Sequence, residues 1–192
     1  MERHAEVARQ RTPRLGGRVV AVFRAEAGQE SWTASAGPGE QVREFEGWDP
    51  RVRTLLGQAG QVFRHGLYTR APLTRWNVGR VTLLGDSAHA MVPFQAQGAA
   101  RAILDAVVLG DALAAVSPAE VPEALHRYVA RRIGSTTRVR AGSTRAGEDY
   151  HLPDGPEADA RNSRLVSYGA ENRIGPHAAV WAADILAEEA PS

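Results

Sequence analysis

The stretch that decides the fold of this chain is RVTLLGDSAHAMVPFQAQGAARAILD, residues 80–105. Residues 79–85 form a short apolar run between two glycines, which is typical of a buried β-strand. From Gly98 onward the sequence is apolar on nearly all sides and rich in small residues, which predicts a buried helix over residues 98–116. A strand, an irregular loop and a helix in succession indicate an α/β arrangement.

The loop between this strand and this helix has the residues of a ligand site. Asp86 follows Gly85 at the end of the strand, and open α/β sheets bind ligands at the carboxyl ends of their strands. A carboxylate there can accept hydrogen bonds from ligand hydroxyls, and the glycine leaves room for close approach. The helix start at Gly98 offers unpaired N–H groups and a partial positive charge. These features predict a site for a polyhydroxyl, electron-rich ligand, although a Gly–Asp turn is common by itself.

Shorter elements are predicted before this stretch. Residues 19–23 form an apolar run that indicates a strand, and residues 30–34 are a second candidate. Residues 41–57 have a helical pattern that Pro50 interrupts, so one helix and two short helices remain alternatives.

Helices are predicted after the stretch. Apolar and small residues recur every three or four positions up to about His151, where the Pro-Asp-Gly-Pro sequence of residues 153–156 ends the pattern. The start of this long helix is open between a capping-box spacing at Ser117 and a first-turn proline at Pro122. A last helix is predicted over residues 177–188.

Composition excludes several classes of function. The chain has 192 residues, and its 23 basic and 22 acidic residues give a net charge of +1, which argues against a protein held to nucleic acid mainly by phosphate contacts. Every basic residue is arginine, so a P-loop lysine and a Schiff-base lysine are excluded. Cysteine is absent, which excludes disulfides and thiolate sites and fits the cytoplasmic localisation that we expect. No apolar run is long enough for a membrane span, and the N-terminus has no apolar leader segment.

Several residues of the stretch stand in one recognisable register. These are Gly85-Asp86, His89, Pro93, Gln97-Gly98-Ala99 and Asp105-Ala106. The pattern closely resembles the second FAD-binding motif of the flavin-dependent aromatic hydroxylases, the group that includes p-hydroxybenzoate and salicylate hydroxylases. Looser similarity covers most of residues 15–165. The chain is thus similar to one portion of such an enzyme.

The resemblance implies a fold and a division of the chain. The fold is α/β: a partial FAD-binding domain of the glutathione-reductase-like Rossmann type, part of a substrate-domain β-sheet, and C-terminal helices. Residues 1–70 would be the C-terminal part of the substrate-binding sheet domain. Residues 71–117 would hold the strand, loop and helix of the second FAD-binding motif, and residues 118–192 would form a helical region.

The resemblance also implies roles for individual residues. Asp86 would bind the ribityl hydroxyls of FAD, and the start of the helix would present backbone N–H groups to the N1/C2 edge of the flavin. Pro93 takes the catalytic position, where it would hold a rigid loop over the isoalloxazine near the site of oxygen transfer. We interpret His89 as a packing residue, and we expect no metal site. The implied cofactor-binding residues are Gly85, Asp86, Pro93, Gln97, Gly98, Ala99 and Ala100.

The implied activity is hydroxylation of a small aromatic substrate with O₂, using FAD and NAD(P)H. The family's G-x-G-x-x-G turn is absent: Gly37-Pro38-Gly39 is the only G-x-G, and Val42 stands where the third glycine belongs. We therefore interpret the chain as the C-terminal half of such an enzyme. We expect it to bind FAD poorly and to be inactive alone. Exposed apolar surface is expected to favour self-association, and no nucleic-acid or membrane partner is expected.

Three alternatives come from other features. Ser87 after Gly85-Asp86 resembles the nucleophile block of GDS-type esterases, although the only D-x-x-H sequence, Asp86–His89, overlaps that block. A non-enzymatic remnant or interaction protein would use an arginine stripe on the long helix to meet an acidic partner or RNA. A metal site at residues 148–151 is the weakest, because its acidic and histidine side chains would not share one helix face. The stripe consists of Arg127, Arg131, Arg138 and Arg145, and the candidate metal ligands are Glu148, Asp149 and His151.

Overall fold

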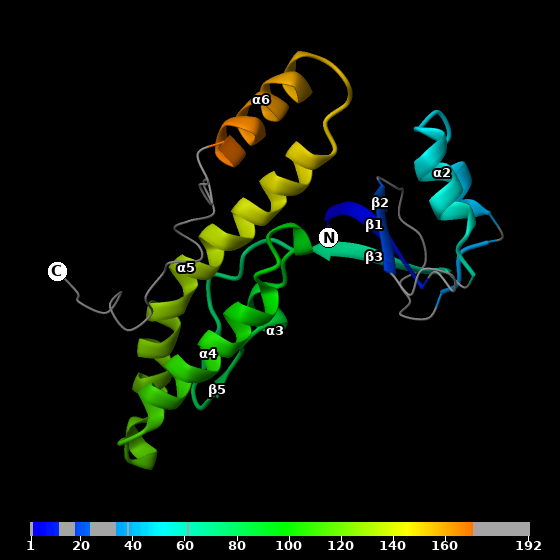
Figure 1. The fold of residues 1–192 in the computed structure, drawn as a ribbon. Helices are drawn as coiled ribbons and strands as arrows, with labels where there is room; N and C mark the ends of the chain where they lie inside the picture. Colours follow the sequence, from blue (N-terminus) through cyan, green and yellow to red (C-terminus); the bar gives the residue numbers. More distant parts are fainter. Residues whose placement is uncertain (1, 12–17, 24–33, 38, 61, 171–192) are drawn as a thin grey trace. The chain divides into compact units, whose positions relative to one another are not determined.

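The computed structural model describes residues 2–11, 18–23, 34–37, 39–60 and 62–170 (Figure 1). The chain divides into two compact units, Met1–Arg70 and Ala71–Ser192. Within the described part of the chain, no helix is both long enough and apolar enough to cross a membrane.

The first unit contains a three-stranded antiparallel sheet in the order β2-β1-β3. Its strands are β1 (Glu2–Arg11), β2 (Arg18–Phe23) and β3 (Val62–Thr69). The strand predicted at residues 19–23 is confirmed by β2. The central strand β1 was not predicted, because its charged residues show no apolar alternation. Its backbone pairs on both edges with residues distant in sequence, for example Val7 with both Val22 and His65. The candidate strand at residues 30–34 lies, apart from Ala34, outside the described residues.

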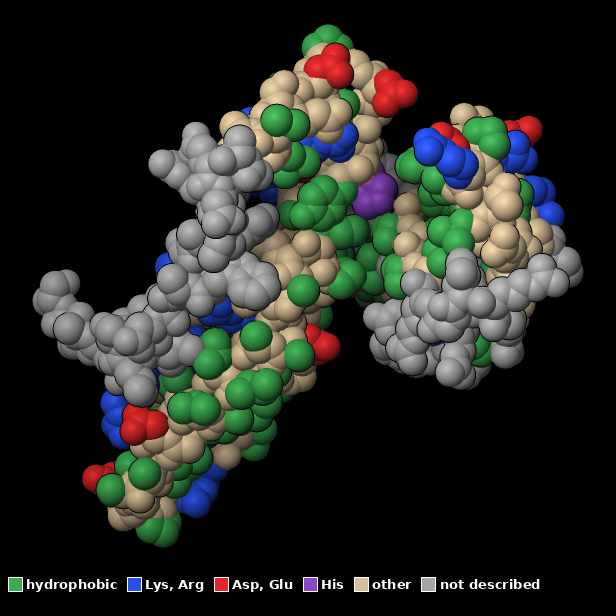
Figure 2. Space-filling view, viewed as in Figure 1, with side chains coloured by type: hydrophobic (Ala, Val, Ile, Leu, Met, Phe, Trp, Pro, Cys, Tyr) green, Lys and Arg blue, Asp and Glu red, His purple; other side chains and the backbone are tan. Residues whose placement is uncertain are grey.

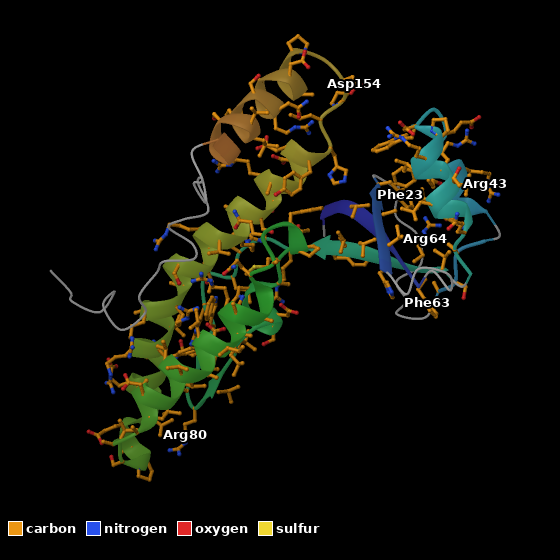
Figure 3. The ribbon with its side chains drawn as sticks, in the orientation of Figure 1. Phe23, Arg43, Phe63, Arg64, Arg80 and Asp154 are labelled. Atoms are coloured by element: carbon orange, nitrogen blue, oxygen red, sulfur yellow. The ribbon has the colours of Figure 1, made fainter. Side chains whose placement is uncertain are left out.

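Two short helices, α1 (Glu40–Arg43) and α2 (Pro50–Gly57), follow in the first unit. Pro50 begins a helix rather than interrupting one, because Asp49 caps α2 by accepting the Arg51 backbone N–H at 2.8 Å. Arg64 of β3 forms an ion pair with Glu40 of α1 at 2.8 Å (Figure 3). The buried core of this unit consists of Ala21, Phe45, Leu56 and Val62.

The second unit begins with a hairpin of two short strands, β4 (Asn77–Val78) and β5 (Val81–Thr82). The prediction of a buried strand over residues 79–85 is wrong in length and in burial, because Val81 is 70% exposed. Among the described residues β5 pairs only with β4, whereas an apolar strand becomes buried when neighbours and a covering layer flank it. Arg80, which lies in the hairpin and is labelled in Figure 3, donates to the Pro118 carbonyl at 2.6 Å.

The functional stretch continues through α3 (Asp86–His89), a 3₁₀ turn η1 (Pro93–Gln95) and α4 (Gly98–Leu113). The predicted helix over residues 98–116 is present and ends three residues early. The expectation that it is buried all round is wrong, because Ile103 is 65% exposed and Val107 is 51% exposed. The long helix of residues 121–150 packs along α4 (Figure 1), whereas nothing in the described part of the chain covers Ile103 and Val107.

The long helix α5 (Val121–Tyr150) uses both of the start signals left open above. Ser117 and Glu120 form a capping box on the 3₁₀ turn η2 (Pro118–Glu120), and Pro122 stands in the first turn of α5. A further helix that was not predicted, α6 (Pro156–Ala170), runs beside the C-terminal end of α5 (Figure 1). The helix predicted over residues 177–188 lies outside the described residues. The buried core of the second unit consists of Trp76, Ala88, Val108, Ala112 and Tyr128.

Candidate functional site

The turn before α3 has a backbone conformation that requires glycine. Gly85 has φ 58° and ψ −142°, and a Cβ added to it would lie 3.3 Å from the Cβ of Ala102 on α4. A side chain at this position would therefore be strained by both the backbone and the neighbouring helix. Asp86 follows as the first residue of α3, and it is exposed at the surface of the second unit.

A buried carboxylate holds this turn against α4. Asp105 Oδ2 accepts the Gly85 backbone N–H at 2.8 Å and lies 2.6 Å from His89 Nε2. Asp105 Oδ1 accepts from Arg132 Nε of α5 at 2.8 Å. The three side chains are almost completely buried, with at most 3% exposed. Because an ionised carboxylate can only accept, the proton between Asp105 Oδ2 and His89 Nε2 belongs to His89.

The hydrogen bonds decide the charge of Asp105. Burial raises the pKa of its carboxyl, but the hydrogen bonds from His89, Arg132 and Gly85 outweigh burial and hold the pKa below its usual value. Asp105 is therefore anionic at neutral pH. Tyr128 beside it is neutral, because burial and the nearby carboxylate raise the pKa of its phenol, whose hydroxyl donates to the Leu83 carbonyl at 3.2 Å.

The network extends from Asp105 to the beginning of α4. Arg132 Nη2 lies 3.4 Å from the Arg101 carbonyl, and Arg132 Nη1 lies 3.3 Å from Ser135 Oγ. Arg101 is buried as well, and its Nη2 donates to Gln97 Oε1 at 3.2 Å. Gln97 is the residue that precedes the first turn of α4. One set of contacts thus links α5, the turn at Gly85 and the start of α4.

The start of α4 is open to a ligand. Gln97 makes no side-chain cap, and the first turn contains no acidic residue. Gly98 is half-buried, whereas Ala99 and Ala100 are exposed. The first-turn N–H groups of an α-helix have no partner within the helix, and they carry a partial positive charge. An electron-rich group of a ligand fits this end of α4.

The loop that carries Pro93 is seated on α5. Pro93 begins η1 and is exposed, while Gln95 N donates to Ser143 Oγ at 3.3 Å. Ser143 Oγ in turn donates to the Val92 carbonyl. Two glycines of α5 make room for the loop. A Cβ on Gly142 would lie 2.9 Å from Gln95 Nε2, and a Cβ on Gly147 would clash with the Phe94 ring.

The predicted site residues thus come from three consecutive segments: the turn at Gly85–Asp86, the loop at Pro93 and the start of α4. The Gly85 contacts bring the turn against α4. Sequence reasoning placed Asp105 in the motif but gave it no role, and it missed Arg132. A signal for Arg132 existed, because it shares the spacing of the buried positions Leu125, Tyr128 and Thr136 on α5.

The geometry does not favour the esterase, the metal site or the arginine-stripe interface. Ser87 Oγ donates to the Leu84 carbonyl at 2.6 Å, and the Nε2 of His89 faces Asp105 rather than a nucleophile. His151 Nδ1 lies 2.6 Å from the Gly147 carbonyl, and no group of three metal-binding side chains occurs in the described part of the chain. Of the arginine stripe, Arg131 forms an ion pair with Asp111 at 2.7 Å, and its other three members are exposed.

Comparisons with known proteins identify the family. Residues 58–142 match the family described as FAD binding domain. The match covers less than half of the chain. It is 42% identical over 136 residues to a 3-amino-4-hydroxybenzoate 2-monooxygenase of Streptomyces platensis, a match that covers 71% of this chain and 34% of that protein. It is 37% identical over 134 residues to a 3-hydroxybenzoate 6-hydroxylase of Polaromonas naphthalenivorans, with coverage of 69% and 33%.

Solved structures give the same family. A salicylate hydroxylase in complex with its substrate has a TM-score of 0.73 and 27% identity, and the match covers 90% of this chain and 44% of that one. HpxO of Klebsiella pneumoniae, complexed with FAD and uric acid, has a TM-score of 0.63 and 26% identity, with coverage of 79% and 39%. The resemblance to the FAD-dependent aromatic hydroxylases and the partial α/β FAD-binding fold are confirmed. The chain spans about a third of the length of the curated relatives it matches.

Proposed function

We propose that residues 85–100 form the flavin-facing part of an FAD site in a monooxygenase that hydroxylates a small aromatic compound. The observation that carries the proposal is the turn at Gly85, which lies against α4 and is followed by the exposed Asp86. The start of α4 is uncapped, and both features lie within the stretch that matches the FAD-binding family. The relatives named above act on hydroxylated benzoates, so a phenolic acid is the substrate class that we propose.

The residues present fit the riboflavin portion of FAD. Asp86 would accept hydrogen bonds from the ribityl hydroxyls, and the N–H groups of Gly98, Ala99 and Ala100 would stabilise negative charge on the flavin edge. Gln97 helps to fix this helix start through its contact with Arg101. The exposed Pro93 would hold the loop, which packs against α5, beside the isoalloxazine ring. When bound, FAD would supply the transfer of electrons from NAD(P)H and of an oxygen atom from O₂ to the substrate.

The same residues offer no site for the adenosine portion. The sequence has no G-x-G-x-x-G turn to receive a pyrophosphate. We therefore propose that the 192-residue chain binds FMN and FAD with similar, weak affinity, since only the shared flavin and ribityl groups would make contacts. We also propose that the chain by itself does not couple NAD(P)H oxidation to hydroxylation.

The test is a titration of the ¹⁵N-labelled chain with FMN and with FAD, followed by amide chemical shifts. We expect shifts centred on Asp86 and on residues 98–100, with dissociation constants in the millimolar range for both compounds. Asp86→Asn should weaken both, whereas Asp154→Asn, in the loop between α5 and α6, should weaken neither. Absence of any response to either flavin would contradict the proposal. A second assay adds NADH or NADPH and 3-hydroxybenzoate, and coupled product formation would overturn the proposed inactivity.

The second unit also has exposed apolar residues outside the proposed flavin site. Hydrophobic side chains gather on the surface of the second unit over α4 and the neighbouring β-hairpin (Figure 2). The exposed apolar residues there are Val78, Val81, Leu84, Ile103 and Val107. Contiguous apolar surface of this kind usually marks an interface. We therefore propose that the isolated chain self-associates through this face.

A further inference from the structure

One carboxylate joins three elements of the second unit. Asp105 lies on α4, receives the Gly85 N–H from the turn before α3, and receives the side chain of Arg132 from α5. It also contacts His89, the last residue of α3. The Gly85–Asp86 turn therefore depends on a residue twenty positions later in the sequence, and through it on α5.

The turn and α3 need this support. The helix α3 has only four residues, too few for a helix that is stable by itself. The Oδ2 atom of Asp105 bonds to both of its ends, at the Gly85 N–H and at the His89 ring. Trp76 packs against the other side of that ring, with ring centroids 5.5 Å apart. Asp86 lies between these two contacts in the sequence, so one oxygen atom holds the chain on both sides of it.

Arg132 fixes the carboxylate that makes these bonds. It donates to Oδ1, so both oxygens of Asp105 are engaged and the carboxylate cannot rotate without losing a bond. Arg132 is itself held by contacts with Ser135 and with the Arg101 carbonyl. Without the guanidinium, a buried carboxylate would lose its main compensating charge and would be driven to protonate or move.

A second ion pair between the same two helices supplies a contrast. Asp111 on α4 pairs with Arg131 on α5 at 2.7 Å, but the Asp111 side chain is 65% exposed, and none of its hydrogen bonds reaches the turn at Gly85. An exposed pair already links α4 and α5. The buried pair differs by its contact with the backbone before Asp86.

We propose that Arg132 and Asp105 are positioning residues for the flavin site, acting through the Gly85 N–H and His89 to hold the turn that carries Asp86 against α4. This inference rests on the proposed function. Neither residue touches the flavin in this arrangement. Their effect is to keep Asp86 in one orientation before the ligand arrives, which lowers the ordering cost of binding.

The test measures amide hydrogen exchange and FMN affinity on the full 192-residue chain. In Arg132→Gln we expect exchange at Gly85 and through α3 to rise at least about tenfold while the middle of α5 stays protected. FMN affinity should fall by about tenfold. Arg132→Lys, which keeps the charge, should recover part of both effects. Asp111→Asn is the matched control and should change neither. If Arg132→Gln does not fold, His89→Leu, which leaves the ion pair intact, is measured in its place.

Each failure has its own meaning. An FMN response with unchanged exchange at Gly85 overturns the inference and leaves the proposed function standing. Faster exchange at Gly85 with unchanged FMN affinity also overturns it, because the turn would then not govern the site. Faster exchange throughout α4 and α5, without recovery by lysine, shows a merely structural role and overturns it too. No FMN response in the unmodified chain overturns the proposed function and this inference with it.

Discussion

At four positions the two faces of α4 depart from the usual relation between hydropathy and burial, whereas Val108 and Ala112 are buried as their hydropathy predicts. Toward α5 the helix buries Arg101 and Asp105, which are 4% and 0% exposed. Away from α5 it exposes Ile103 and Val107. The charged residues are buried because specific donors and acceptors meet them, and the apolar residues are exposed because nothing in the described structure covers them. At these four positions burial therefore follows from the partners of each residue and not from its hydropathy.

The buried charges and the exposed apolar side chains of α4 affect the free energy of unfolding to different extents. A buried charge costs several kcal/mol unless it is paired and hydrogen-bonded, and the Asp105 carboxylate has donors on both oxygens. An exposed apolar side chain costs the protein only the stabilisation that its burial would have supplied. Mutations on the two faces should accordingly have very different consequences.

The largest effect is expected at Asp105. Asp105→Ala leaves Arg132 buried without its counter-ion, so the free energy of unfolding should fall by about 3–5 kcal/mol, as is usual when one partner of a buried pair is removed. Asp111→Ala breaks an exposed pair and should cost at most about 1 kcal/mol. Urea denaturation followed by circular dichroism measures both. Equal losses in the two variants would show that the buried face has no special importance.

Replacing both charges should recover much of this loss. In Asp105→Leu with Arg132→Met, neither charge remains uncompensated, and apolar replacement of a buried ion pair is often close to neutral. We expect the double variant to be more stable than Arg132→Met alone in the same denaturation assay. If the double variant is the less stable of the two, the cost lies in lost hydrogen bonds to Gly85 and His89 and not in an unpaired charge.

Low pH should remove part of the stabilisation that the ionised Asp105 provides. The pKa of Asp105 is lowered in the folded chain, so its contribution to stability is complete above the unfolded-state pKa of about 3.9 and is lost as the pH falls through the folded-state pKa. The urea midpoint should therefore drop below about pH 4. Below this pH, the urea midpoint of Asp105→Asn should fall less steeply than the urea midpoint of Asp111→Asn. If the urea midpoints of the two variants fall equally steeply, the lost stability does not come from Asp105.

A smaller effect on the free energy of unfolding is expected where the Pro93 loop packs against α5. Gly147→Ala places a methyl group against the Phe94 ring and should cost about 1–3 kcal/mol, which is typical of overpacking. Gly134 is also on α5, but a Cβ there meets only Arg138 Nη1 at 3.7 Å. Gly134→Ala should stabilise the helix by about 0.5–1 kcal/mol. Thermal melting of both variants gives the signs, and a loss of similar size at Gly134 would contradict the role of the loop contact.

The smallest effect on stability is expected on the exposed apolar face of α4. Ile103→Gln with Val107→Gln should change the free energy of unfolding by less than about 0.5 kcal/mol, since both side chains already meet solvent. Self-association, measured by sedimentation velocity, should nevertheless decrease. Thr137→Gln with Arg138→Gln, on the exposed side of α5, is the control. Unchanged association in the Ile103 and Val107 variant would show that copies of the chain meet elsewhere.

Local sequence signals predicted many of the elements. Residues 19–23, with their β-branched apolar run, form β2. The starts of α2 and α5 carry proline in their first turns, and the glycine at position 85 occupies a left-handed conformation. The motif from Gly85 to Asp105 also identified the FAD-binding family, which the match at residues 58–142 confirms. Such signals succeed because they depend on the geometry of neighbouring residues.

The tertiary structure alone decided which of these residues are buried and paired. Arg132 was counted among 23 arginines and had no predicted role, because its partner Asp105 lies 27 residues away in sequence. Val81 was predicted to be buried, but its exposure depends on which strands and helices lie beside β5. Backbone conformation is largely a local property, whereas burial and ion pairing are set by segments that only the folded chain brings together. The sequence therefore determined the motif and its family, and the fold determined the buried pair that we propose positions Asp86.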